Sequence, residues 1–253
     1  MSPGLGLNCA GTGPDCSWAG PYLLPQLKNA SAINRNAVSV YLGHDKPGQA
    51  NAEIILGGAY DRAKVRGKQF TVDMVDPFNA ELTNNQANMV NITAIEAVID
   101  GKKTTKSLKT KARPEGLTTV LDTGNPAWFM PKSIFDVVIA ELGNATQAER
   151  QEYYNVDCKY RNPKHAKGHL TVEFGTAGKI NVPIHSLVTD FGNGKCGSYI
   201  GSGENDGSNL GCPFLRSAYV IFDQESFTMT LSQARFTDKK DIVAFPEGGF
   251  KVE

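Results

Sequence analysis

The sequence has no excess of charge of either sign and no long apolar run. Lys and Arg number 26 and Asp and Glu number 26 among 253 residues, so the formal net charge is zero. Proteins that bind nucleic acids usually carry a basic excess, and this balance argues against such a partner. No stretch approaches the roughly 18 apolar residues that a membrane-spanning helix needs. We therefore expect neither a nucleic-acid partner nor a transmembrane segment.

The first residues also lack the features of a secretion signal. Residues 1–6 contain neither a basic segment nor an apolar one, and we expect no signal peptide in the sequence. Five cysteines and the glycosylation sequons at Asn29, Asn91 and Asn144 are nevertheless typical of a secreted or cell-surface protein. A secreted-looking chain without a secretion signal leads us to expect that an N-terminal portion is missing.

The sequence does contain many short runs with β character. These runs alternate apolar and polar residues, or are short and apolar, and Gly, Asn, Asp or Pro separate them. They cover residues 38–42, 53–56, 70–75, 90–95, 117–121, 169–174, 218–222 and 227–231. Such spacing predicts a mainly β fold.

Helices are expected at only two places. The clearer one follows Pro131 and ends at a cap on Gly143. One face of this helix is apolar and consists of Ile134, Phe135, Val138 and Leu142. A shorter helix at residues 22–27 is limited by Pro25.

The clearest chemical candidate is the Asp-Thr-Gly tripeptide at Asp122, Thr123 and Gly124, which follows the apolar run 117–121. An apolar strand that ends in Asp delivers a carboxylate into a turn, where Gly permits backbone paths that other residues rarely adopt. Taken alone, the tripeptide also fits an ordinary turn in which Asp caps its own backbone. Its surroundings therefore have to decide between the two interpretations.

Two other patterns give weaker predictions. His165 and His169 are four residues apart, but Pro163 and Gly168 disfavour a helix there, so we expect loop histidines and no metal site. The pair at 194–195 lacks the upstream glycine of a phosphate-binding loop. No metal and no cofactor is predicted.

A basic stretch precedes the Asp-Thr-Gly tripeptide. Its six cations are Lys102, Lys103, Lys106, Lys109, Lys111 and Arg113. We expect them to form the solvated part of a hairpin before the strand at 117–121. Contact with an anionic wall polymer is the alternative.

The order of these motifs resembles that of the pepsin-like aspartic proteases. The Asp-Thr-Gly segment and the helix after it look like that family's second catalytic loop. A later segment resembles its signature in which an apolar-apolar-Gly loop crosses the active-site strand. The matching stretches are residues 3–7, 37–42, 54–61, 119–124, 128–131 and 210–223. They are most similar to the fungal members, of the yapsin-like or secreted type.

The resemblance implies a bilobal fold with a partial N-terminal lobe at 1–75. A complete C-terminal lobe with the interlobe sheet is expected at 76–253. It also implies a catalytic role for Asp122 and substrate contacts for Thr123, Gly124 and Asn125. Asn125 stands where the family usually has Thr or Ser.

The resemblance also assigns one cysteine pair. Cys158 and Cys196 fall where the family's C-terminal lobe has its disulfide. Cys9 and Cys16 are expected to close a small loop, which leaves Cys212 as a free and buried thiol.

The departure from the family concerns the number of carboxylates. The family uses two Asp-Thr/Ser-Gly loops, and this sequence contains one. Two adjacent carboxyls share a proton, so one can activate a water while the other polarises the scissile carbonyl. The leading hypothesis is therefore a truncated aspartic endopeptidase, monomeric, acting on peptides or proteins in its intact form but inactive as given.

Two alternatives to this hypothesis remain open. The first is a non-catalytic relative that binds peptides or proteins. The second is a homodimer in which each chain donates Asp122, an arrangement that the partial N-terminal lobe would obstruct.

Overall fold

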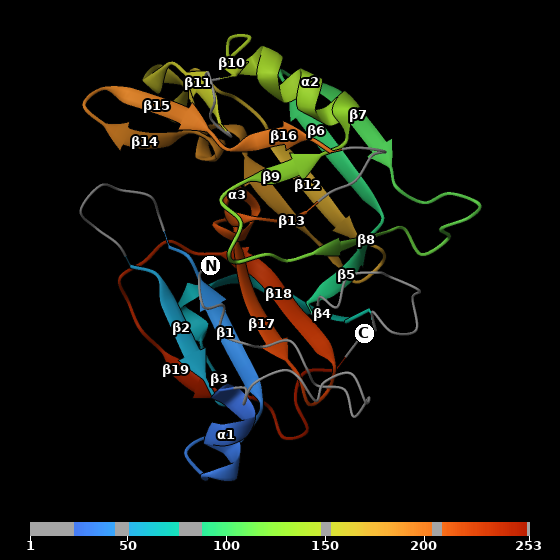
Figure 1. The fold of residues 1–253 in the computed structure, drawn as a ribbon, viewed down its shortest axis with the longest axis vertical. Coiled ribbons are helices and arrows are strands. Elements are labelled where there is room, and N and C mark those ends of the chain that lie inside the picture. The colour runs from blue at the N-terminus through green and yellow to red at the C-terminus, as the bar shows by residue number, and fades with distance from the viewer. Residues whose placement is uncertain (1–22, 44–50, 76–87, 148–152, 204–208, 252–253) are drawn as a thin grey trace. The chain divides into compact units, whose positions relative to one another are not determined.

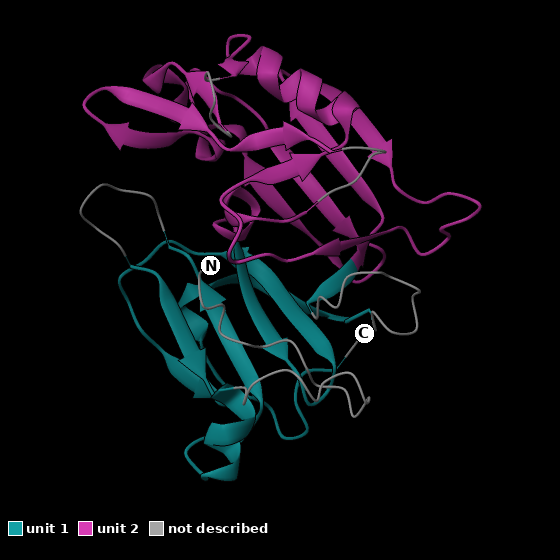
Figure 2. Ribbon diagram, in the orientation of Figure 1, with its two compact units in different colours: residues 1–43, 51–90, 218–253 teal, residues 44–50, 91–217 magenta. Residues whose placement is uncertain are grey.

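The chain forms two compact units, which are coloured separately in Figure 2. The computed structural model describes residues 23–43, 51–75, 88–147, 153–203 and 209–251. Unit 1 consists of residues 1–43, 51–90 and 218–253, and unit 2 consists of residues 44–50 and 91–217. The return of the C-terminal residues to unit 1 makes that unit discontinuous in sequence, and the expected lobes at 1–75 and 76–253 stay a prediction.

Strands dominate both units, as Figure 1 shows, and the expected mainly β fold is confirmed. Within the described ranges, no helix is long and apolar enough to cross a membrane.

The described part of unit 1 contains two helical segments and most of the N-terminal strands. Its elements are α1 (Leu23–Asn29), β1 (Ala37–Tyr41), β2 (Glu53–Leu56), β3 (Ala59–Asp61), the 3-10 helix η2 (Arg62–Lys64), β4 (Val65–Asp73), β17 (Ala218–Asp223), β18 (Thr228–Ala234) and β19 (Ile242–Ala244). Strand β5 (Met89–Ile92) carries the chain from unit 1 into unit 2.

The main sheet of unit 1 has five strands in the order β2-β1-β17-β18-β4. All neighbours are antiparallel, although β1 and β17 are far apart in sequence. Every residue of β1 and β17 is buried, which explains why both runs are almost continuously apolar. One core cluster consists of Tyr41, Tyr219, Ile221 and Ala234, with Tyr60, Val65, Phe245 and Phe250 packed against it.

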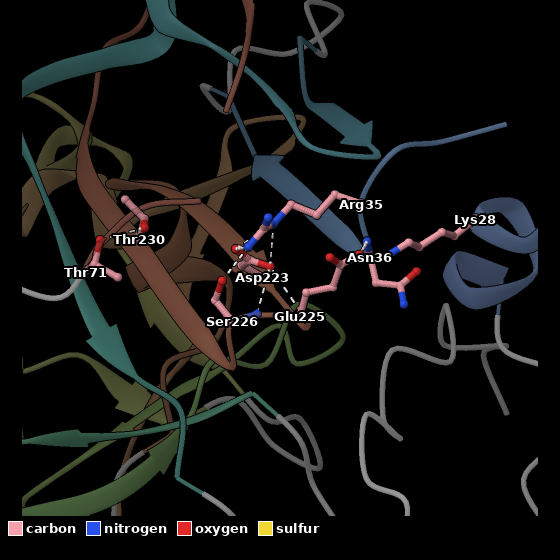
Figure 3. Close-up of polar contacts among 8 residues, drawn as sticks. All are labelled: Lys28, Arg35, Asn36, Thr71, Asp223, Glu225, Ser226 and Thr230. Carbon is pink, nitrogen blue, oxygen red and sulfur yellow. Dashed lines mark hydrogen bonds and ion pairs between the residues drawn. The ribbon is translucent and has the colours of Figure 1, made fainter. Parts of the chain in front are cut away.

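An ion pair joins the start of β1 to the end of β17 (Figure 3). Arg35 Nε donates to both carboxylate oxygens of Asp223, at 3.0 and 2.9 Å, and its Nη2 lies 2.8 Å from Oδ2. The Asp223 side chain is 2% exposed, and that of Arg35 is 18% exposed. The backbone N–H groups of Glu225 and Ser226 also donate to Asp223, at 3.2 and 3.3 Å.

The same network reaches helix α1. Glu225 accepts a hydrogen bond from the backbone N–H of Asn36 at 2.7 Å and forms an ion pair with Lys28. Figure 3 also labels a second buried contact of unit 1, the 2.8 Å hydrogen bond between the hydroxyls of Thr71 in β4 and Thr230 in β18.

Unit 2 contains smaller sheets and one longer helix. Its strands are β6 (Ala94–Ile99), β7 (Lys102–Ser107), β8 (Leu117–Val120), β9 (Trp128–Met130), β10 (Thr146–Gln147), β11 (Tyr154–Val156), β12 (His169–Phe174), β13 (Gly178–Pro183), β14 (Thr189–Gly192), β15 (Lys195–Ser198) and β16 (Ile200–Ser202). Its helical segments are α2 (Lys132–Glu141), η3 (Cys158–Arg161), η4 (Ile184–Leu187) and α3 (Cys212–Leu215).

The sheets of unit 2 are built mainly from local hairpins. One four-stranded sheet has the order β13-β12-β6-β7, and another has the order β10-β11-β15-β14. The prediction of a single strand at 90–95 was wrong. Thr93 interrupts it and separates β5 from β6. There the Thr93 N–H donates to the carbonyl of Glu173 at 2.8 Å, and the Thr93 carbonyl accepts from Leu108 at 2.9 Å.

Both predicted helices are present. Helix α1 covers residues 23–29, slightly later than expected, and Pro25 lies in its first turn. Helix α2 buries Ile134 and Val138 and ends before Gly143, whose φ of +76° is the left-handed conformation of a helix cap. The Asn144 N–H closes that cap by donating to the carbonyl of Ile139 at 2.9 Å.

Candidate active site

Strand β8 delivers Asp122 into a loop that is held by a distant segment of the chain. Leu210 forms a parallel bridge with Leu121. The Leu210 N–H donates to the carbonyl of Val120 at 2.8 Å, and the Asp122 N–H donates to the carbonyl of Leu210 at 3.1 Å. Leu121 and Leu210 are 1% and 0% exposed, so apolar burial fixes the backbone on both sides of the crossing.

The loop after Asp122 is closed by its own polar groups. Asp122 Oδ1 accepts a hydrogen bond from the Gly124 N–H at 3.0 Å, the local capping expected of an Asp that ends a strand. Asn125 Oδ1 accepts from the Ala127 N–H at 2.8 Å, and the Asn125 carbonyl accepts from the Cys212 N–H at 2.9 Å. Asn125 thus connects the loop to the segment that crosses it.

Close backbone approach requires a glycine at position 211. A Cβ there would lie 2.0 Å from the carbonyl oxygen of Ala127 and 2.7 Å from that of Asn125. A Cβ on Gly124 would lie 3.4 Å from Asp122 Oδ1, a far milder contact. The glycine that allows the loop crossing is therefore Gly211, while Gly124 mainly supplies a donor to the carboxylate.

Three aromatic side chains, Trp128, Phe174 and Phe214, pack together; Trp128 follows the loop in sequence, and Phe214 lies on the segment that crosses it. Trp128 and Phe214 are fully buried, and their ring centroids lie 6.0 Å apart in an edge-to-face arrangement. Phe174 of β12 packs on the other side of Phe214, with a centroid distance of 6.3 Å. Strand β9, which begins at Trp128, pairs in parallel with β16, so the chain after the loop is held by both packing and backbone bonds.

The four residues expected to act on substrate differ in exposure. Asp122 and Asn125 are half-buried, whereas Thr123 and Gly124 are exposed. All four lie in one loop of unit 2. Their contacts with a substrate stay a prediction.

Cys212 follows Gly211 and begins helix α3. It is a free thiol, but it is half-buried rather than buried as expected, because it occupies the first position of a short helix facing the loop. Burial raises the pKa of the Cys212 thiol, the Asp122 carboxylate raises it further, and Arg216 opposes the change. The thiol is therefore held in its neutral form near Asp122.

Two of the other four cysteines, Cys158 and Cys196, lie within the described residues. Cys158 and Cys196 form a disulfide with Cα atoms 5.2 Å apart, connecting η3 to β15. Cys9 and Cys16 lie outside the described residues.

The three sequon asparagines lie in different surroundings. Asn29, at the end of α1, and Asn144, after α2, are exposed. Asn91 is a half-buried residue of β5, and its Oδ1 accepts a hydrogen bond from Thr118 Oγ1 at 2.8 Å. The side chain of Asn91 is therefore less accessible to a glycosylating enzyme than those of the two exposed asparagines.

The histidine pair does not form part of a larger cluster. Across the described part of the chain, no group of three or more His, Cys, Asp or Glu side chains is arranged to hold a metal ion.

Sequence reasoning missed Asn209 as a residue that shapes the site. Asn209 Oδ1 accepts from the Phe129 N–H at 2.9 Å, and the Asn209 N–H donates to the Phe129 carbonyl at 3.3 Å. A lone Asn in a polar loop gives no signal of this pairing, because the partner strand is 80 residues away.

Comparison with known proteins places this geometry in a family. The family described as Eukaryotic aspartyl protease matches residues 10–234. Aspartic proteinase 3 of Saccharomyces cerevisiae is 30% identical over 218 residues, which are 86% of this chain and 36% of that protein. Secreted aspartic protease 8 of Candida albicans is 28% identical over 216 residues, 85% of this chain and 45% of that protein.

Candidapepsin of Candida tropicalis is 30% identical over 220 residues, 86% of this chain and 48% of that protein. The chain thus spans less than half the length of these curated relatives. The family match covers most of the chain and includes the Asp122 loop and the segment that crosses it. The chain belongs to the eukaryotic aspartyl protease family, of the pepsin-like type.

Proposed function

We propose that this chain carries one catalytic loop of an aspartic endopeptidase, with Asp122 as one member of the catalytic pair. The observation that carries the proposal is the Asp122 loop itself, held by Leu210 and Cys212 from a distant segment. This holds the carboxylate in a defined position while leaving it half-buried rather than enclosed. Family membership supports a peptide or protein substrate.

The chemistry of the proposed reaction depends on a second carboxylate. One ionised carboxylate accepts a proton from a water, and a protonated partner donates a hydrogen bond to the scissile carbonyl. Asp122 can hold and orient a water, but the sequence contains no second Asp-Thr-Gly or Asp-Ser-Gly. We therefore infer that the 253-residue chain alone does not hydrolyse peptide bonds.

A cleavage assay of the purified chain tests this inference. We expect no turnover of a peptide substrate between about pH 3 and pH 7, the range in which carboxylate pairs titrate. The matched control is Asp122→Ala, which should be indistinguishable from the unmodified chain. Pepstatin-sensitive turnover that Asp122→Ala abolishes would contradict the inference. A rate that rises with the square of the chain concentration would instead support the dimer.

A second candidate function is peptide binding without catalysis. A loop that is fully formed around a single Asp favours it. The transcript sequence upstream of Met1 separates the candidates. A second Asp-Thr/Ser-Gly there supports the endopeptidase, and an initiation site at Met1 supports the non-catalytic protein.

We propose further that the protein acts outside the cell, in a secreted or cell-surface form and as a monomer. The disulfide supports an oxidising compartment. The relatives named secreted aspartic proteases support the same location.

Exposure favours glycans on Asn29 and Asn144 over Asn91, and glycopeptide mapping after expression in a glycosylating host tests that order.

A further inference from the structure

Six cations lie on strand β7 and on the loop that follows it, at positions 102–113 of unit 2, and we call this segment the basic edge. Asp100 and Gly101, with φ of 47° and 74°, form the tight turn that brings β7 back along β6. Strand β7 is an outer strand of its four-stranded sheet, so among the strands that the structure describes it has a neighbour on one side only. The expected hairpin before β8 is present, and the loop after β7 projects from unit 2 in Figure 1.

The loop that continues the basic edge has a fixed shape. Leu108 is 2% exposed, and its backbone N–H donates a hydrogen bond to the carbonyl of Thr93, which anchors the chain at this point. Thr110 and Arg113 then exchange backbone hydrogen bonds of 3.0 and 3.1 Å, which closes a two-residue turn. Lys111 lies in this turn and Lys109 just before it, so the backbone fixes the points at which these two side chains leave the loop.

Few of these charges are used inside the protein. Lys103 forms an ion pair with Glu96, and Lys106 is half-buried and engaged. The other four are exposed and make no ion pair with any residue that the structure describes; they are Lys102, Lys109, Lys111 and Arg113. Since the whole chain has a net charge of zero, this local excess is a property of the surface and not of the composition.

The side chains around these charges select among anionic partners. Residues 102–113 contain no aromatic side chain, so they offer no platform on which bases of a single-stranded nucleic acid could stack. Their one large apolar side chain, Leu108, is buried, so they offer no exposed apolar anchor for a peptide. What remains is a set of exposed cations, with Lys102 at the start of β7 and Lys109, Lys111 and Arg113 in the loop that follows.

We propose that the basic edge binds an acidic polysaccharide, a polymer that carries repeated sulfate or phosphate groups. An extended polyanion can contact Lys102 and the exposed loop cations at the same time, whereas a single small anion contacts only one or two. Arg113 adds a planar donor group that matches sulfate and phosphate oxygens in pairs. The proposal does not depend on catalysis by Asp122.

The test uses immobilised heparin as a sulfated polysaccharide and the purified 253-residue chain. The triple variant Lys109→Gln/Lys111→Gln/Arg113→Gln removes three loop cations. The control Lys164→Gln/Lys179→Gln/Lys195→Gln removes the same charge from exposed positions of unit 2, including β13 at the opposite side of the sheet. Thermal unfolding of both variants checks that the fold is kept, and all six positions are exposed.

We expect the loop variant to bind about tenfold more weakly at low salt, since three exposed charge contacts are lost, while the control stays within about twofold. Phosphorylated mannan and dextran sulfate, used as soluble competitors, distinguish phosphate from sulfate groups, and neutral dextran should not compete. Equal affinities of the two triple variants would overturn the proposal. Stronger competition by single-stranded DNA or by polyglutamate than by either acidic polysaccharide would also overturn it.

Discussion

Asp223 in unit 1 and Asp122 in unit 2 both stand at the end of an apolar run, yet their surroundings are opposite. Asp223 is 2% exposed, and it accepts hydrogen bonds from Arg35 and from two backbone N–H groups. Asp122 is half-buried and accepts from the Gly124 N–H within its own loop. The comparison teaches that a carboxylate enclosed by donors serves the fold, whereas one that is positioned but open is available for chemistry.

The strongest test of this comparison replaces each carboxylate in turn. Asp223→Ala leaves Arg35 largely buried without its main counter-charge, and breaking a buried pair costs about 3–5 kcal/mol of unfolding free energy. Asp122→Ala should change that free energy by less than about 0.5 kcal/mol, as expected for a position outside such networks. Urea unfolding of the two variants measures both values. Equal losses would remove the distinction between the two aspartates.

The disulfide tests whether unit 2 depends on a covalent constraint as unit 1 depends on its ion pair. Cys158 and Cys196 are 38 positions apart, and opening a loop of that size costs about 4 kcal/mol by the chain-entropy estimate. The double variant Cys158→Ala/Cys196→Ala should lose that amount, and Cys212→Ala serves as the unbridged control. Thiol counting in the unfolded, unreduced protein should give one reactive group, and five would contradict the disulfide assignments.

Thr71 and Thr230 sharpen the comparison by separating burial from charge. Both side chains are buried in the sheet of unit 1. Their hydroxyl oxygens lie 2.8 Å apart in a hydrogen bond between two neutral groups. Thr71→Val should cost about 1 kcal/mol, because it leaves the Thr230 hydroxyl without that partner. The double variant Thr71→Val/Thr230→Val should lose less than the sum of the single variants. A single loss as large as that of Asp223→Ala would show that charge is not the decisive factor.

We expect the smallest effect for Glu225, which makes the unfolding free energy depend on pH. Burial opposes its ionisation, but the bonds from Lys28 and from the Asn36 N–H outweigh burial and lower the pKa of Glu225 below its ordinary value of 4.5. A lowered folded-state pKa stabilises the protein above the ordinary value, and this contribution is lost as the pH falls through the folded-state pKa.

Glu225→Gln should therefore flatten the stability profile below about pH 4.5, by less than about 1 kcal/mol because the pair with Lys28 is partly exposed to solvent. Unfolding free energies of both proteins between about pH 3 and pH 7 measure the difference. Parallel profiles over the whole range would contradict a role for this carboxylate.

Local patterns predicted the elements whose contacts are local. Strand β12 has the predicted bounds 169–174, because alternating residues pair with the adjacent strand β13. Helix α2 follows from its apolar face and its capping glycine. The break at Thr93 could not be predicted, because it depends on hydrogen bonds to Glu173 and Leu108 rather than on the apolar pattern of 90–95.

The candidate site divides in the same way. Asp122, Thr123 and Gly124 are visible as a motif, and the resemblance indicated that residues near 210 cross the strand. The pairing of Arg35 with Asp223, 188 positions apart, leaves no trace in either local segment. Nor does the sequence reveal which of the sequon asparagines already has a side-chain partner, as Asn91 has in Thr118.

The discontinuity of unit 1 sets the order in which the protein can mature on the ribosome. Arg35 and Asp223 are separated by 188 positions, and at roughly 5–20 residues per second the ribosome needs about 10–40 s to make that segment. During this time β1 has been synthesised without its partner β17, while the hairpin of β6 and β7 can already form. Nascent chains of this protein therefore expose apolar strand surface until β17 has been synthesised, and chaperones would be needed most in that interval.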